Sequence, residues 1–223
     1  MLAKKLKRTV SLLLLIVLIF NFSSMALAAD EAETGSGSIP VDYVKAAYTS
    51  EKMYYCGELY LFTDNMMKIN YEMAAIAANL KEYINGSLLT SDKTTLNNLI
   101  KQYNIVCKTY NSWVDVKPSL EKYIEVIDDN LIYTNEQLQS AFTDTLATIN
   151  ATKPLLESAR IYAENTTTNA KIRLNNSINS TIRKGANASK AIEPYLARSM
   201  RGYRSFFDEF SELAGIKIAV DDQ

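Results

Sequence analysis

The feature that most constrains the fold is an unbroken row of apolar side chains in the first half of the chain. Its members follow one another in alternating steps of four and three residues: Tyr55, Leu59, Phe62, Met66, Ile69, Met73, Ile76, Leu80 and Tyr83. In a helix, this spacing puts every member on one side, as in the seam of a coiled coil. The row therefore predicts a long helix that packs lengthwise against other helices and ends at Asn85-Gly86.

The length of that helix limits the shape of the protein. A single helix over residues 41–84 would be about 66 Å long at 1.5 Å per residue. A compact globule made from a chain of this size would be only about 40 Å across. Either the helix breaks, near Gly57 or residues 63–65, or the protein is an elongated bundle. Because the apolar row continues through both places, we expect the elongated bundle.

The chain after this helix repeats the same spacing. Helix starts are indicated at Ser91-Asp92, at Pro118, and at Thr134, where Gln137 completes a capping box. We expect a kink or break at Pro154, and a poorly buried helix over residues 164–190, where Asn, Ser and Thr dominate. The apolar rows of these helices are Leu96, Leu99, Tyr103, Val106, Tyr110 and Trp113; Leu120, Ile124, Ile127 and Leu131; Leu138, Phe142, Leu146 and Ile149; and Leu196, Met200, Tyr203, Phe207 and Phe210. The sequence predicts an all-α, elongated helical bundle with coiled-coil-like long helices, about five to six in number.

The first 28 residues have the pattern of a secretory signal peptide. A basic start (Lys4, Lys5, Lys7 and Arg8) precedes an apolar run over residues 11–20, and Ala26-Leu27-Ala28 supplies small residues before a cleavage point. The apolar run is short for a transmembrane helix, although an uncleaved anchor is the alternative. We expect cleavage between Ala28 and Ala29, a flexible linker over 29–40, and one helical domain over 41–220. The protein would then be secreted or extracytoplasmic, without a stable transmembrane segment, and the basic start is typical of bacteria.

Composition argues against several kinds of catalysis. The chain contains no histidine, so it has no imidazole base or ligand, and it has only two cysteines. It carries no glycine-rich phosphate loop and no calcium-binding loop. A run of carboxylates at helical spacing could bind a hard cation or act in acid–base chemistry, but a solvated acidic face is the simpler interpretation: Glu121, Glu125, Asp128 and Asp129. We therefore expect no enzymatic activity, no metal and no cofactor.

The two cysteines, Cys56 and Cys107, leave two alternatives open. Export would favour a disulfide between them. If the first two helices form a straight hairpin, however, the two residues are offset along its axis by about 20 Å. Bridged Cα atoms lie about 6 Å apart. The other alternative is that both are small, buried apolar side chains.

Charge is distributed unevenly along the chain. The segment 165–207 has a net charge of +7, with Glu193 as its single acidic residue, while residues 29–164 have a net charge of −8. Its basic residues are Lys171, Arg173, Arg183, Lys184, Lys190, Arg198, Arg201 and Arg204. They could bind a polyanion outside the cell, or they could pack against the acidic part of the chain and be neutralised. No nucleic-acid-binding motif accompanies them, so no specific nucleic acid partner is expected.

Together these observations predict an exported, non-enzymatic helical bundle that acts by surface contact, at the cell envelope or with a protein partner. The alternative is a membrane-active protein that binds anionic lipid or a cell-wall polyanion through residues 165–207. An enzyme built on the carboxylates is a third hypothesis. Self-association through an exposed part of an apolar row is a further one.

Overall fold

The structure is a computed structural model, and it describes residues 42–85 and 93–216. Every regular element in these two ranges is a helix, and no strand occurs in them. Residues Val41–Gln223 group into one compact unit. The predicted all-α helical bundle is therefore confirmed. The signal peptide and the linker lie outside the described residues.

The first described helix, α2 (Tyr43–Asn85), is unbroken over its 43 residues. At 1.5 Å per residue it is about 65 Å long. Seven members of the predicted apolar row, from Leu59 to Leu80, are almost completely shielded from solvent. Neither Gly57 nor Thr63 interrupts the helix, and the Thr63 hydroxyl donates to the carbonyl of Leu59 one turn earlier. The spacing of the apolar row thus predicted both the helix and its buried side.

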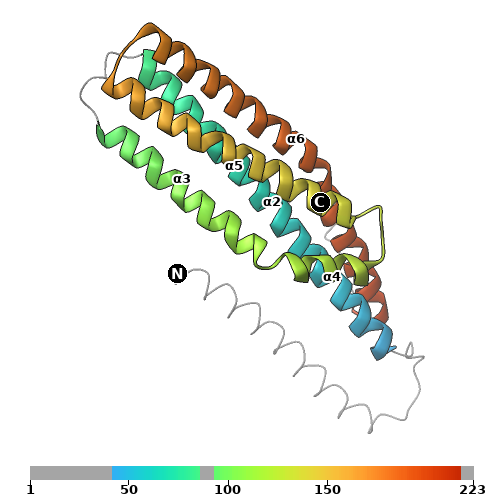
Figure 1. The fold of residues 1–223 in the computed structure, drawn as a ribbon. Helices are drawn as coiled ribbons and strands as arrows, with labels where there is room; N and C mark the ends of the chain where they lie inside the picture. The colour runs from blue at the N-terminus through green and yellow to red at the C-terminus, as the bar shows by residue number, and fades with distance from the viewer. Residues whose placement is uncertain (1–41, 86–92, 217–223) are drawn as a thin grey trace, which may run out of the picture. The chain divides into compact units, whose positions relative to one another are not determined.

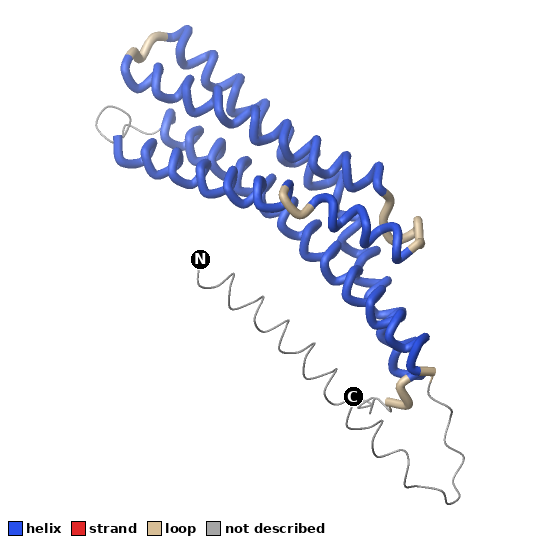
Figure 2. Tube along the Cα trace, turned by 60° about the horizontal axis from the view of Figure 1, so that its bottom comes forward, coloured by secondary structure: helices blue, strands red, loops and turns tan. Residues whose placement is uncertain are grey.

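Four further helices pack with α2: α3 (Lys93–Val114), α4 (Lys117–Ile127), α5 (Asn135–Glu164) and α6 (Thr168–Leu213). Figure 1 shows α3, α5 and α6 as long rods nearly parallel to α2, with the short α4 beside the N-terminal half of α2. Figure 2 shows α3 to α6 as helices joined by short connections. The predicted proline start of α4 is present, and so is the complete Thr134–Gln137 capping box of α5. These local signals fixed where α4 and α5 begin.

The expectation at Pro154 needs correction, and Pro194 behaves in the same way. Pro154 lies inside α5 and Pro194 inside α6, and neither ends its helix. Both prolines are exposed to solvent. A proline on that side leaves the unpaired carbonyl of the preceding turn accessible to water, and buried neighbours such as Leu155 and Leu156 hold the helix in the bundle. The predicted kink or break at Pro154 is therefore not a break.

The Asn-, Ser- and Thr-rich segment also behaves differently from the expectation. From Thr168 onward it belongs to one continuous helix, α6, whose 46 residues run past Gly185. Several small residues of the segment face inward and are buried, among them Thr181, Gly185 and Ser189. The Thr181 hydroxyl donates to the Ala151 carbonyl on α5 over 3.4 Å. Polar composition suggested weak burial, but small size at the inward positions allows close packing instead.

The most extensive contact in the bundle is the one between α2 and α6. A Cβ atom on Gly185 would lie 2.8 Å from the Asn70 carbonyl oxygen and 3.3 Å from the Ala74 Cβ. A Cβ on Gly202 would lie 2.5 Å from Ile132 Cδ1 and 3.1 Å from Cys56 Sγ. Both glycines are therefore needed as gaps in the surface of α6 rather than as turns.

Three residues of the predicted apolar rows are exposed rather than buried. Leu131 is 81% exposed because α4 ends at Ile127, where Asp128 takes a left-handed conformation (φ 49°) and turns the chain. Leu146 and Phe207 are also exposed. In the C-terminal part of α6, the buried line runs through Ile192, Ser199, Gly202 and Phe210, of which only Phe210 belongs to the predicted row. The row was predicted from large side chains alone, whereas two of these buried positions hold small residues.

Candidate functional site

All eight predicted polyanion-binding residues lie on one helix, α6. Seven of them are exposed to solvent: Lys171, Arg173, Arg183, Lys184, Lys190, Arg201 and Arg204. Arg198 is half-buried, and its guanidinium carbon lies 5.5 Å from the centre of the Tyr195 ring. Stacking on an aromatic ring keeps the positive charge available while it fixes the side chain. The structure thus presents the basic residues of α6 to solvent rather than to the core.

The basic residues gather on the side of α6 that faces away from the bundle. At 100° per residue, all of them except Lys171 lie in an arc of about 160° opposite the buried line that includes Leu174, Ile178 and Ile192. Arg183, Lys190 and Arg201 lie within about 20° of one another on this outer side. We call the seven residues in this arc the α6 basic face: Arg173, Arg183, Lys184, Lys190, Arg198, Arg201 and Arg204.

Ion pairs within the described residues do not neutralise this face. The four that form are Lys45–Glu209, Lys68–Asp64, Lys117–Glu121 and Arg160–Glu157. Three of them join residues three or four positions apart on one helix, and none includes a member of the α6 basic face. The alternative in which the acidic part of the chain neutralises this segment therefore finds no support in the described ranges. Three of the four paired acids have their partner on the same helix and Glu209 pairs with Lys45 on α2, while the cations of the α6 basic face are exposed apart from the half-buried Arg198.

The two cysteines are both free. Cys56 is completely buried on α2, and its sulfur lies where a Cβ on Gly202 of α6 would approach it. Cys107 is half-buried on α3. The two thiols thus face different surroundings, and no disulfide joins α2 to α3. Burial raises the pKa of the Cys56 thiol to about 12, with a smaller contribution from Asp129. A thiol that stays protonated at neutral pH is a poor nucleophile.

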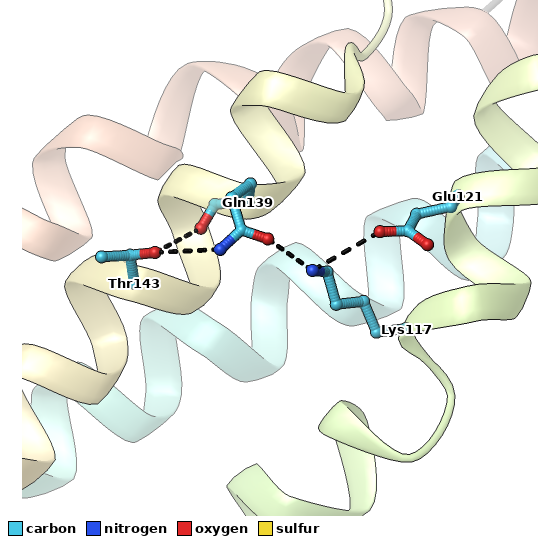
Figure 3. A network of polar contacts seen from close by, with 4 residues as sticks. All are labelled: Lys117, Glu121, Gln139 and Thr143. Carbon is cyan, nitrogen blue, oxygen red and sulfur yellow. Dashed lines mark hydrogen bonds and ion pairs between the residues drawn. The ribbon is translucent and has the colours of Figure 1, made fainter.

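The four carboxylates of the predicted run lie on α4 and in the turn that follows it. Glu121 pairs with Lys117, which also donates to Gln139 on α5 (Figure 3). Asp128 ends α4, and Asp129 accepts from the backbone N–H of Leu131. Within residues 42–85 and 93–216, no group of three acidic or cysteine side chains could hold a metal ion. These carboxylates shape the turn after α4 and join it to α5.

A shallow groove lies between α2 and α3, with a volume of about 440 Å³. Its floor includes Ile69 and Val106, and Ile105 stands at its edge with most of its side chain exposed. Its remaining lining residues are neutral polar side chains, two lysines and Glu72.

Comparison with known proteins identifies no relative. No protein family, no curated protein and no solved structure matches the chain. In the described part of the chain, none of the helices is apolar enough over a sufficient length to span a bilayer. The site is therefore argued from its own geometry. The sequence alone already indicated part of the α6 basic face, since Arg183 and Lys190 are seven residues apart and must share a side of any helix that includes both.

Proposed function

We propose that the protein is an exported, non-enzymatic helical bundle that acts by surface contact, and that its α6 basic face binds an anionic component of the cell envelope. The observation that carries the proposal is the outward exposure of this face without ion-pair partners among the described residues. Export is supported by the pattern of residues 1–28.

The charge of the whole chain does not oppose this function. The chain has a net charge of −1, and removal of residues 1–28 with their four basic residues would make it more acidic. At physiological ionic strength, charges separated by more than about 8 Å are largely screened. A ligand on the outer side of α6 therefore responds mainly to the local cations. Glu193, on α6 itself, is the one acid within the basic segment.

Five of the seven cations are arginines: Arg173, Arg183, Arg198, Arg201 and Arg204. A guanidinium group donates two parallel hydrogen bonds to a phosphate or carboxylate, and it holds its charge at every physiological pH. The face can therefore recognise oxyanions by geometry as well as by charge.

The test compares two matched variants of the mature chain. The first neutralises four exposed cations of the face (R183Q, K190Q, R201Q and R204Q). The control neutralises four exposed lysines on α2, α3 and α4 (K81Q, K101Q, K108Q and K122Q), so both variants lose the same charge. Titration calorimetry with long-chain polyphosphate and with phosphatidylglycerol vesicles, at increasing NaCl, reports binding to both kinds of anion.

We expect the unmodified chain to bind at least one of these anions, more weakly as salt increases. The first variant should lose about a thousandfold in affinity at low salt, since each of the four cations near an anionic surface contributes about 1 kcal/mol. The control should lose much less. If the unmodified chain binds neither anion at low salt, or if the two variants lose affinity equally, the α6 basic face is not a binding surface.

Export is tested separately. Expression of the full chain in a secreting bacterial host, followed by intact-mass measurement of the protein outside the cytoplasm, should show a product that starts at Ala29. Retention of the full-length mass in the cytoplasm would contradict the proposed location without affecting the binding test.

A further inference from the structure

We propose that the ligand of the α6 basic face is an extended anionic polymer that lies along the helix, and not the flat surface of a bilayer. This inference rests on the proposed function and specifies its ligand. The ligand class is a flexible chain of repeating oxyanion groups, phosphate or carboxylate, as the arginine-rich face requires.

The first argument concerns the apolar side of α6. Helices that lie on membranes bury an apolar face at the boundary between headgroups and acyl chains. The apolar side of α6 is already buried against α2 and α5. Between Arg173 and Arg204 no large hydrophobic side chain of this helix is exposed, and Ile172 and Phe207 stand just outside those limits. The face therefore offers charge without an apolar anchor for lipid.

The second argument concerns curvature. The seven cations cover an arc of about 160° around the helix. A flat surface can approach only a narrow strip of such an arc, which would include Arg183, Lys190 and Arg201. Arg173, Lys184 and Arg198 lie about 60° to 120° around the helix from that strip, so the flat surface would not contact them. These residues form a lateral row, and Arg183, Lys190 and Arg201 form an outermost row. A flexible polymer can run between the two rows and contact both.

The third argument concerns length. Arg173 and Arg204 are 31 positions apart on an uninterrupted helix, which corresponds to about 46 Å. Exposed amides lie between the cations, at Asn176, Asn179 and Asn187. An amide can donate to oxyanions or accept from hydroxyl groups of a polymer. A long, polar, cationic line matches a chain of repeating groups better than it matches a single small anion.

The experiment uses two triple variants of the mature chain. One neutralises the outermost row (R183Q, K190Q and R201Q), and the other neutralises the lateral row (R173Q, K184Q and R198Q). Both remove three positive charges. Circular dichroism and thermal melting confirm that each variant is folded as the unmodified chain is. Affinities are measured for inorganic tripolyphosphate, long-chain polyphosphate, poly-glutamate and phosphatidylglycerol vesicles.

For an extended polymer, both variants should lose affinity for the preferred long chain by a similar factor, about a hundredfold at low salt. The long chain should also bind more tightly than tripolyphosphate, because only the long chain can span both ends of the face. Preference for polyphosphate or for poly-glutamate identifies the anionic group as phosphate or carboxylate.

Three results would overturn the inference while leaving the proposed function intact. Vesicles could bind more tightly than either polymer, tripolyphosphate could bind as tightly as the long chain, or the lateral row could prove dispensable. Failure of the unmodified chain to bind any of the four anions would overturn the proposed function itself.

Discussion

Replacement of Gly185 by alanine tests the idea that α2 and α6 approach each other through a gap in the α6 surface. The variant G185A adds one Cβ atom at a point 2.8 Å from the Asn70 carbonyl oxygen and 3.3 Å from the Ala74 Cβ. The oxygen belongs to the backbone of a continuous helix, so it cannot move without α2. We therefore expect G185A to force apart the two helices that share the most extensive contact in the bundle.

Two opposing terms set the magnitude. Alanine is favoured over glycine inside a helix by about 1 kcal/mol. Overpacking of a tight core contact costs about 1–3 kcal/mol, and more where backbone must move. Because the obstructing atom here is backbone, we place the cost at the upper end, so the free energy of unfolding should fall by about 1–2 kcal/mol net.

Gly57 supplies the matched control. It lies on α2, and a Cβ there would meet only the Tyr203 ring at 3.7 Å, an ordinary contact distance. The variant G57A should keep the helix-propensity gain and become more stable by about 0.5–1 kcal/mol. Urea unfolding of the mature chain, followed by circular dichroism, measures both changes. Should G185A prove as stable as the unmodified chain, or should both variants change stability in the same direction, the account of the α2–α6 contact would be wrong.

Three further predictions follow from single contacts. T134A should lower the free energy of unfolding by about 1 kcal/mol in urea, since Thr134 and Gln137 satisfy each other's backbone N–H groups at the start of α5; an unchanged midpoint would argue that the cap contributes nothing. In the native protein Cys107 should react with a thiol reagent faster than Cys56, because Cys56 is completely buried and its pKa is raised to about 12. Mass spectrometry of the labelled protein measures both rates, and faster labelling of Cys56 would contradict its buried position. The free energy of unfolding should also fall above about pH 9, because the Cys56 thiol ionises there in the unfolded chain but stays protonated in the folded protein until about pH 12. The contribution of Cys56 is up to about 1.4 kcal/mol per pH unit. The variant C56A should show a shallower alkaline decline in stability, and an identical pH profile would refute this.

Local sequence patterns predicted parts of the helical structure directly. Apolar spacing predicted α2 and its buried side, and short signals at Pro118 and Thr134 placed the starts of α4 and α5. These predictions succeed because side chains repeat around a helix with a fixed period, and because caps and prolines act on neighbouring residues. The basic segment was also visible as composition, and the seven-residue spacing of Arg183 and Lys190 already placed them on one side of a helix.

Other features depended on which helices became neighbours. Pro154 and Pro194 remain inside helices because the tertiary structure turns them toward solvent, and Gly185 and Gly202 act as contact points because α2 lies against them. The burial of Thr181, Ser189 and Ser199 has the same origin, since hydrophobicity alone does not distinguish a small polar residue at a close contact from one at the surface.

The sequence by itself thus determined that the protein is helical, where α2 lies, where α4 and α5 begin, and that one segment is strongly basic, because periodicity, capping and charge are local properties of the chain. Only the tertiary structure decided that this segment directs its cations away from the bundle and that the two thiols stay apart. Both outcomes depend on the pairing of distant helices, in which α6 turns its small residues toward α2 and leaves its charged side to solvent.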